Sequence, residues 1–123
     1  MAKSGRDEER EERITMEIVV DAYGPEEQAM GWYYYLQDTL QFPFTAVCVS
    51  KRRISPLKTG ATVKVVDMAP EDECEREMFV EIEWEGDRLG VPLIQLEAPK
   101  ADAETQQAIA DWHYWVNQGY EFG

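Results

Sequence analysis

Apolar residues recur every three or four positions between residues 25 and 40, a spacing typical of an amphipathic helix. The stripe consists of Ala29, Trp32, Tyr33, Leu36 and Leu40. Pro25 followed by two glutamates matches the preferences of a helix start. Pro43 predicts that the helix has ended before it, because the residue preceding a proline avoids helical geometry.

From residue 45 the period changes to two, which predicts β-strands. The strand-like segments are 45–50, 62–68, 78–84 and 88–93, and the tripeptide at 85–87 predicts a hairpin turn between the last two. Four or five short strands joined by tight turns favour a small antiparallel SH3-like β-barrel.

A second helical stripe is predicted over residues 103–118, with Asp102 as its N-cap and Gly119 just past its end. Residues 14–20 fit either an N-terminal helix or a β-branched edge segment, and the pattern does not separate the two. Residues 1–13 are predicted to be a charged, flexible tail, frayed or weakly helical. Residues 14–123 are then one α+β domain, in which the barrel is flanked by an N-terminal and a C-terminal helix.

The length of 123 residues and a hydrophobic content of 44% support one folded domain with its own core. No apolar run approaches the ~18 residues of a membrane span, and no secretory signal is seen, so we expect a cytoplasmic protein. Cys48 and Cys74 are not in a CxxC motif, and we expect no disulfide. The net charge of −13 argues against nucleic acid and for cations or basic partners. We expect a monomer.

Charge is concentrated between residues 67 and 87, where ten carboxylates accompany a single basic residue, Arg76. Carboxylates held ~4–6 Å apart repel by roughly 1 kcal/mol per pair in water, so folding them together requires a compensating cation. The segment 71–77 alone offers five carboxylates in seven residues. With no histidine nearby, this oxygen-rich set favours calcium over zinc or copper.

The acidic segment is not an EF-hand, because counting from Asp72 places Glu77 where the loop requires glycine. Spacing alone also allows a solvated acidic loop that aids solubility. Asp38, near the end of the first helix, and Glu81 and Glu83, on one strand face, fit exposed polar positions as well as ligand positions.

No motif for an enzyme is present: GxSxG, P-loop, GxGxxG and HExxH are all missing from the sequence. His113, the one histidine, is interpreted as a packed or surface imidazole, and Cys74 among carboxylates is expected to be a poor nucleophile. The alternative to calcium binding is an SH3-like interaction module whose acidic face docks a basic protein partner without metal. A third possibility is a solubilising domain with no ligand.

Four phrases of the sequence resemble the cyanobacterial calcium-binding family called CcbP. They are WYYYLQDTLQFPFTA (32–46), SPLKTGATVKVVDMAPEDECEREMFVEIEWEG (55–86), LGVPLIQLE (89–97) and IADWHYWVNQGYEF (109–122). The resemblance covers about residues 28–122 and implies a calcium buffer or sensor outside the EF-hand class, with carboxylate sites of unequal affinity. It places the metal ligands at Asp38, Glu71, Asp72, Glu73, Glu75 and Glu77, followed by Glu81 and Glu83.

Overall fold

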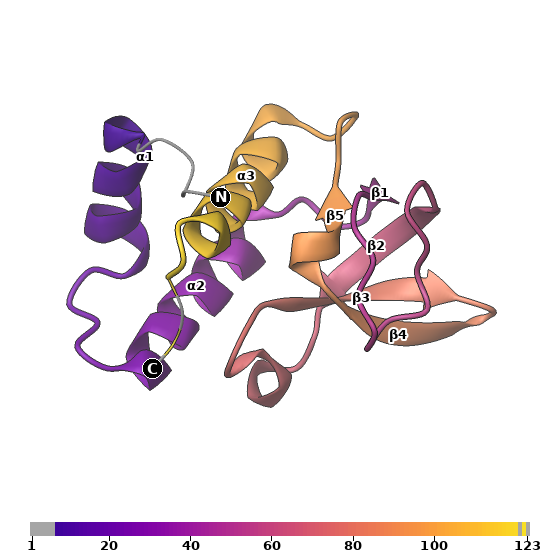
Figure 1. The fold of residues 1–123 in the computed structure, drawn as a ribbon, viewed down its shortest axis with the longest axis horizontal. Helices are drawn as coiled ribbons and strands as arrows, with labels where there is room; N and C mark the ends of the chain where they lie inside the picture. Colours follow the sequence, from indigo (N-terminus) through magenta and orange to yellow (C-terminus); the bar gives the residue numbers. More distant parts are fainter. Residues whose placement is uncertain (1–6, 121, 123) are drawn as a thin grey trace.

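The computed structural model describes residues 7–120 and residue 122, and it is an α+β fold with its helices gathered beside a five-stranded antiparallel sheet (Figure 1). The helices are α1 (Glu8–Arg13), α2 (Pro25–Thr39) and α3 (Ala103–Asn117). The strands are β1 (Phe44–Cys48), β2 (Thr62–Met68), β3 (Phe79–Trp84), β4 (Asp87–Pro92) and β5 (Leu96–Glu97). No helix in this part of the chain is both long and apolar enough to cross a membrane.

The predicted helices are confirmed, together with their ends. α2 begins at Pro25, and the stripe residues Trp32 and Leu36 are completely buried. α3 is capped by Asp102, whose carboxylate accepts a hydrogen bond from the Thr105 amide at 3.1 Å. Gly119 has a φ of 86°, the left-handed geometry that terminates many helices.

The strands lie close to the predicted segments, and 62–68 matches β2 completely. The hairpin between β3 and β4 turns at Glu85 and Gly86, which both have positive φ, as the type I′ turn requires. The predicted barrel is wrong. The strand order is β4-β3-β2-β1-β5, and β4 and β5 remain as separate edges of an open sheet. β5 is two residues long, too short to close the sheet against β4.

The N-terminal region also differs from the expected flexible tail. Residues 8–13 form α1, and residues 14–18 continue it as a π-helical turn, η1, which answers the choice left open for that segment. Residues 1–6 lie outside the described part of the chain. α1 is fixed to α3 because Asp111, fully buried on α3, accepts hydrogen bonds from the Arg13 guanidinium at 2.6 and 3.3 Å.

The same Asp111 carboxylate joins a second arginine and a second helix. Arg10 Nε lies 3.2 Å from Asp111 Oδ1, and the Tyr35 hydroxyl of α2 donates to Asp111 Oδ2 at 3.0 Å. Burial, together with this carboxylate, raises the pKa of Tyr35, so the phenol stays protonated and remains a donor. One buried anion therefore holds all three helices together.

Candidate metal site

The acidic segment leaves β2 at Met68 and returns to the sheet at Phe79, and its centre is a single 3₁₀ turn, η2 (Glu71–Cys74). Its base is fixed by buried groups. The Tyr33 hydroxyl of α2 donates to the Ala69 carbonyl at 2.8 Å, and the Cys74 sulfur accepts from the Phe79 amide at 3.3 Å. The loop is thus anchored at both ends while its carboxylates stay at the surface.

Cys74 is turned away from the carboxylates and is 1% exposed. Burial, reinforced by the neighbouring acidic residues, raises the pKa of its thiol to about 11. A protonated, inward-facing thiol offers no soft ligand, so the exposed atoms of the loop are carboxylate oxygens. This donor set matches the preference of calcium for hard oxygen ligands.

Glu71 is the loop carboxylate that faces α2. The Tyr34 hydroxyl donates to its two oxygens at 3.2 and 3.3 Å, and this hydrogen bond raises the pKa of Tyr34. Asp38 lies one helical turn beyond Tyr34, about 6 Å further along the axis. It is exposed, and it makes no hydrogen bond or ion pair with any described residue. The structure therefore brings the loop to the face of α2 that carries Asp38.

Glu73 extends in the opposite direction, over the β3–β4 hairpin. Its Oε1 lies 3.4 Å from the point where a Cβ on Gly90 would be, and Gly90 is directly opposite Glu81 in the sheet. Residues directly opposite in an antiparallel pair share a face, so Glu73 and Glu81 lie on the same side of the sheet. Glu81 in turn pairs with Asp67 of β2, which adds a third carboxylate to this face.

Asp67 was not predicted as a ligand. Alternation with the buried Val63 and Val65 would place it on the buried face, but a β-bulge between Val65 and Asp67 leaves it exposed at the strand end nearest the loop. Its Oδ1 already accepts a hydrogen bond from the Met68 amide at 2.8 Å. Glu83 also lies on β3, two residues beyond Glu81 and opposite Arg88, and it is exposed.

Two of the predicted ligands are engaged by arginines. Glu77 accepts two hydrogen bonds from Arg52, at 2.7 and 3.1 Å, and Glu81 accepts one from Arg88 at 3.2 Å. Arg52 comes from the basic connector between β1 and β2. A calcium ion that used Glu77 or Glu81 would have to compete with these guanidinium groups, whereas Asp72 and Glu75 stay exposed on the loop.

The carboxylates thus form two groups and are not gathered around one point. Within residues 7–120 and 122, no three His, Cys, Asp or Glu side chains are arranged as a ready metal site. Calcium takes six to eight oxygens at about 2.3–2.6 Å, so binding requires the exposed carboxylates to move together. The carboxylate oxygens are therefore the right kind of ligand for calcium, but their side chains must rearrange to reach the required distances.

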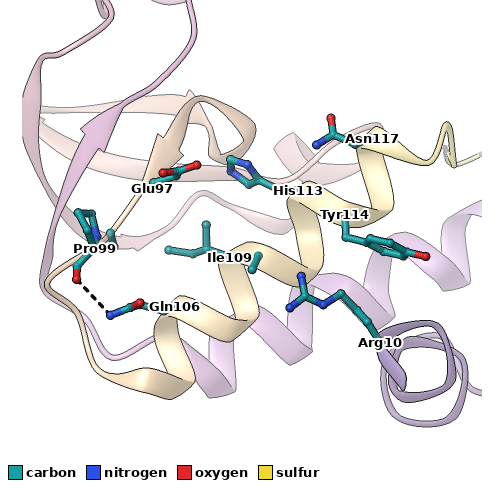
Figure 2. Close-up of a pocket in the computed structure, with 10 residues that line it drawn as sticks. Arg10, Glu97, Pro99, Gln106, Ile109, His113, Tyr114 and Asn117 are labelled. Atoms are coloured by element: carbon teal, nitrogen blue, oxygen red, sulfur yellow. Dashed lines mark hydrogen bonds between the residues drawn. The ribbon is translucent and has the colours of Figure 1, made fainter. Parts of the chain in front are cut away.

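A separate cavity of about 490 Å³ lies between α1, α3 and residues 97–99, away from the acidic loop (Figure 2). Figure 2 shows His113 directed toward the Glu97 side of this cavity, and its Nε2 lies 2.8 Å from the Leu96 carbonyl oxygen. The interpretation of His113 as a packed imidazole is consistent with this contact. Of the described residues that line this cavity, Glu97 is the one carboxylate, so they do not provide the set of carboxylate ligands that a calcium site requires.

Comparison with known proteins agrees with this chemistry. The model of a family described as calcium binding, CcbP, matches residues 12–116. The crystal structure of Anabaena CcbP matches with a TM-score of 0.87 and 50% identity, over 99% of this chain and 100% of the other. A second structure, of a calcium-binding protein in the calcium-binding form, matches with a TM-score of 0.85 and 49% identity over the same shares. No curated protein matches the sequence. The chain belongs to the CcbP family of calcium-binding proteins.

Proposed function

We propose that this protein binds calcium reversibly through its exposed carboxylates and acts as a calcium buffer or sensor. The observation that carries the proposal is the match, at 49% identity and full length, to a structure of a calcium-binding protein in its calcium-binding form. The exposed carboxylates of the acidic loop supply ligands of the right chemistry in two groups on the surface.

The two directions taken by the loop support two groups of ligands. The first group is Glu71, Asp72 and Glu75 of the loop, with Asp38 supplied by α2. The second group is Glu73 with the strand residues Glu81 and Glu83, and with Asp67 beside them. Glu77 joins only if it is released by Arg52. Because the second group must displace Arg88 from Glu81, it is the weaker of the two.

Calcium titration by calorimetry, with magnesium as the competing ion, tests the proposal. We expect saturable calcium uptake that magnesium weakens little, because magnesium demands a near-ideal octahedral site and retains its waters. Calcium at ~100 times its dissociation constant should stabilise the fold by about 2.7 kcal/mol relative to chelator. Equal unfolding midpoints in calcium and in chelator would contradict the proposal.

Asp38→Asn separates the two groups of ligands. It should weaken the tighter site and leave the weaker site unchanged, because the substitution removes one charged oxygen ligand from α2. Glu104→Gln is the matched control, since Glu104 is an exposed acidic residue in the first turn of α3. If both variants titrate like the parent protein, Asp38 is not a ligand.

A further inference from the structure

A groove of about 890 Å³ runs between the N-terminal half of α2 and the acidic loop. Its apolar part consists of Ala29, Met30 and Tyr33 of α2 together with Phe122. Met30 is 37% exposed. Phe122 is held at this place by stacking on the Trp112 ring, with centroids 6.0 Å apart.

The rim of the groove is strongly acidic. Glu26 of α2 lies on one side, and Glu71, Asp72 and Glu75 of the loop lie on the other. Among the residues that the structure describes, Arg76 is the one cationic residue that lines the groove, so the described rim has a net charge of −3 from four carboxylates and one guanidinium. A surface of this kind attracts cationic groups and disfavours acidic ones.

Calcium binding explains the carboxylates of the loop but not the groove as a whole. A metal ion does not cover Met30 or Phe122, and Glu26 is remote in sequence from the ligands proposed above. An apolar strip bordered by carboxylates matches a different occupant, one that carries apolar and basic side chains together. A short amphipathic segment does this, because residues three or four apart share one helix face.

We infer that this groove docks a basic amphipathic segment of a protein partner, and that calcium and the segment compete. The competition rests on the proposed function, because Glu71, Asp72 and Glu75 serve both as calcium ligands and as the acidic rim. Calcium held by these residues cancels the charge that recruits the lysines or arginines of the segment. Linkage makes the effect reciprocal. The bound segment lowers the affinity of the protein for calcium by the same factor by which bound calcium lowers its affinity for the segment.

A fluorescein-labelled helical peptide of lysine and leucine, with leucines at three-and-four spacing, tests the groove in chelator by fluorescence anisotropy. Binding should weaken about tenfold with Met30→Gln, which removes an apolar contact of roughly 1.5 kcal/mol. Glu26→Gln should weaken it less and reduce its salt dependence. Met16→Gln is the matched control, since Met16 is 62% exposed and does not line the groove.

Two further peptides separate specific docking from general attraction. Serine in place of leucine, or glutamate in place of lysine, should abolish binding. Equal binding of the serine peptide, or equal affinity of the parent and Met30→Gln proteins, would overturn the inference. Absence of binding would also overturn it, as would a concentration-dependent dimer dissociated by Met30→Gln, since a second copy would then be the occupant.

Calcium added to the peptide complex tests the competition separately. Saturating calcium should lower the affinity of the protein for the peptide at least several-fold. Calorimetry in saturating peptide should show that the affinity for calcium falls by the same factor. If calcium is taken up normally and the peptide does not bind, the groove inference fails and the proposed function stands. If the peptide binds and calcium is not taken up, the proposed function fails and with it the competition. Tighter peptide binding in calcium would also overturn the competition.

Discussion

Two arginine side chains pair with carboxylates of the acidic surface. Arg52 holds Glu77 through two hydrogen bonds, and Arg88 holds Glu81 through one. Each guanidinium occupies oxygens that a calcium ion could otherwise use, so each lowers the affinity of the carboxylates it contacts. The cost is modest for Arg88, whose side chain is 60% exposed and well screened by water.

Replacing Arg88 with glutamine should therefore strengthen calcium binding at the weaker group. An exposed ion pair contributes about 0–1 kcal/mol, so we expect up to roughly a fivefold gain in affinity, measured by calorimetry. Arg53→Gln is the matched control, because Arg53 is also exposed and pairs with no described carboxylate. Weaker calcium binding in Arg88→Gln than in Arg53→Gln would show that Arg88 positions Glu81 and does not compete for it.

Asp111 is the most consequential charged residue of the core. Asp111→Asn removes the anion that pairs with Arg13 and Arg10, whose side chains are 24% and 27% exposed. Since both guanidinium groups keep some access to water, we expect a loss of about 2–3 kcal/mol, below the ~3–5 kcal/mol of a fully buried pair. Urea unfolding measures the loss of stability, and a double-mutant cycle with Arg13→Gln isolates the interaction energy between Asp111 and Arg13. A loss below that of Glu104→Gln would contradict this role.

The burial of Asp111 could be predicted from the sequence pattern, but its arginine partners could not. It lies three residues after Ala108 and one before Trp112, on the buried stripe of α3, so its burial could be predicted from spacing. A buried carboxylate requires paired donors, and the nearest arginines in the fold are 98 and 101 residues away in the chain. The sequence pattern alone does not identify such a distant partner. The charged N-terminal residues therefore resembled a tail.

Among the elements, the junction between η1 and α2 depends on one glycine. A Cβ on Gly31 would lie 2.3 Å from the Ile18 carbonyl oxygen, so Gly31→Ala forces η1 away from α2. We expect a loss of about 1–3 kcal/mol, the usual cost of overpacking. Gly24→Ala is the control, because its nearest neighbour, a Glu27 side-chain oxygen, is 3.8 Å away. Equal unfolding midpoints in urea for the two variants would refute the close contact.

The rate at which the Cys74 thiol reacts with a labelling reagent measures how well the acidic loop is ordered. Because burial raises the pKa of this thiol to about 11, its protonated form contributes stability below its ordinary pKa, and that contribution is lost as pH rises through 11. In a Cys48→Ala background, disulfide reagents should label Cys74 slowly at about pH 8. Calcium should slow labelling further by ordering residues 69–77, with the denatured protein as control. Faster labelling in calcium would show that the ion opens the loop.

Local patterns predicted the elements well because each depends on nearby residues. β2 follows from the alternation of its first residues, in which Val63 and Val65 are buried, and α3 follows from Asp102 at its start and Gly119 at its end. The barrel was wrong because closure depends on which edges meet, and strand β5 has only two residues with which to reach β4. The acidic loop was predicted from the residue pattern, and a ligand from α2 was implied only by the family resemblance. The engagement of Glu77 and Glu81 by arginines required the tertiary structure.

The molecule as a whole carries a net charge of −13, and the two groups of ligands contain much of it. Without calcium these charges repel one another through water and lower the stability of the fold. The distance over which they repel is the screening length set by the salt concentration. Salt shortens that distance from about 30 Å at ~0.01 M to about 3 Å at ~1 M. The ion pairs that hold α1 are partly buried and are screened much less than the exposed carboxylates.

Raising sodium chloride from ~0.02 M to ~0.5 M should therefore raise the melting temperature in chelator, because repulsion is screened. The further increase produced by calcium should shrink over the same range, since the repulsion that calcium relieves is already reduced. Thermal unfolding followed by circular dichroism measures both effects. Sucrose is the control for non-electrostatic stabilisation, because it raises the melting temperature by exclusion from the protein surface and should leave the increase produced by calcium nearly unchanged. A melting temperature that falls with salt in chelator would show that attractive pairs, and not crowded carboxylates, dominate the electrostatics of this fold.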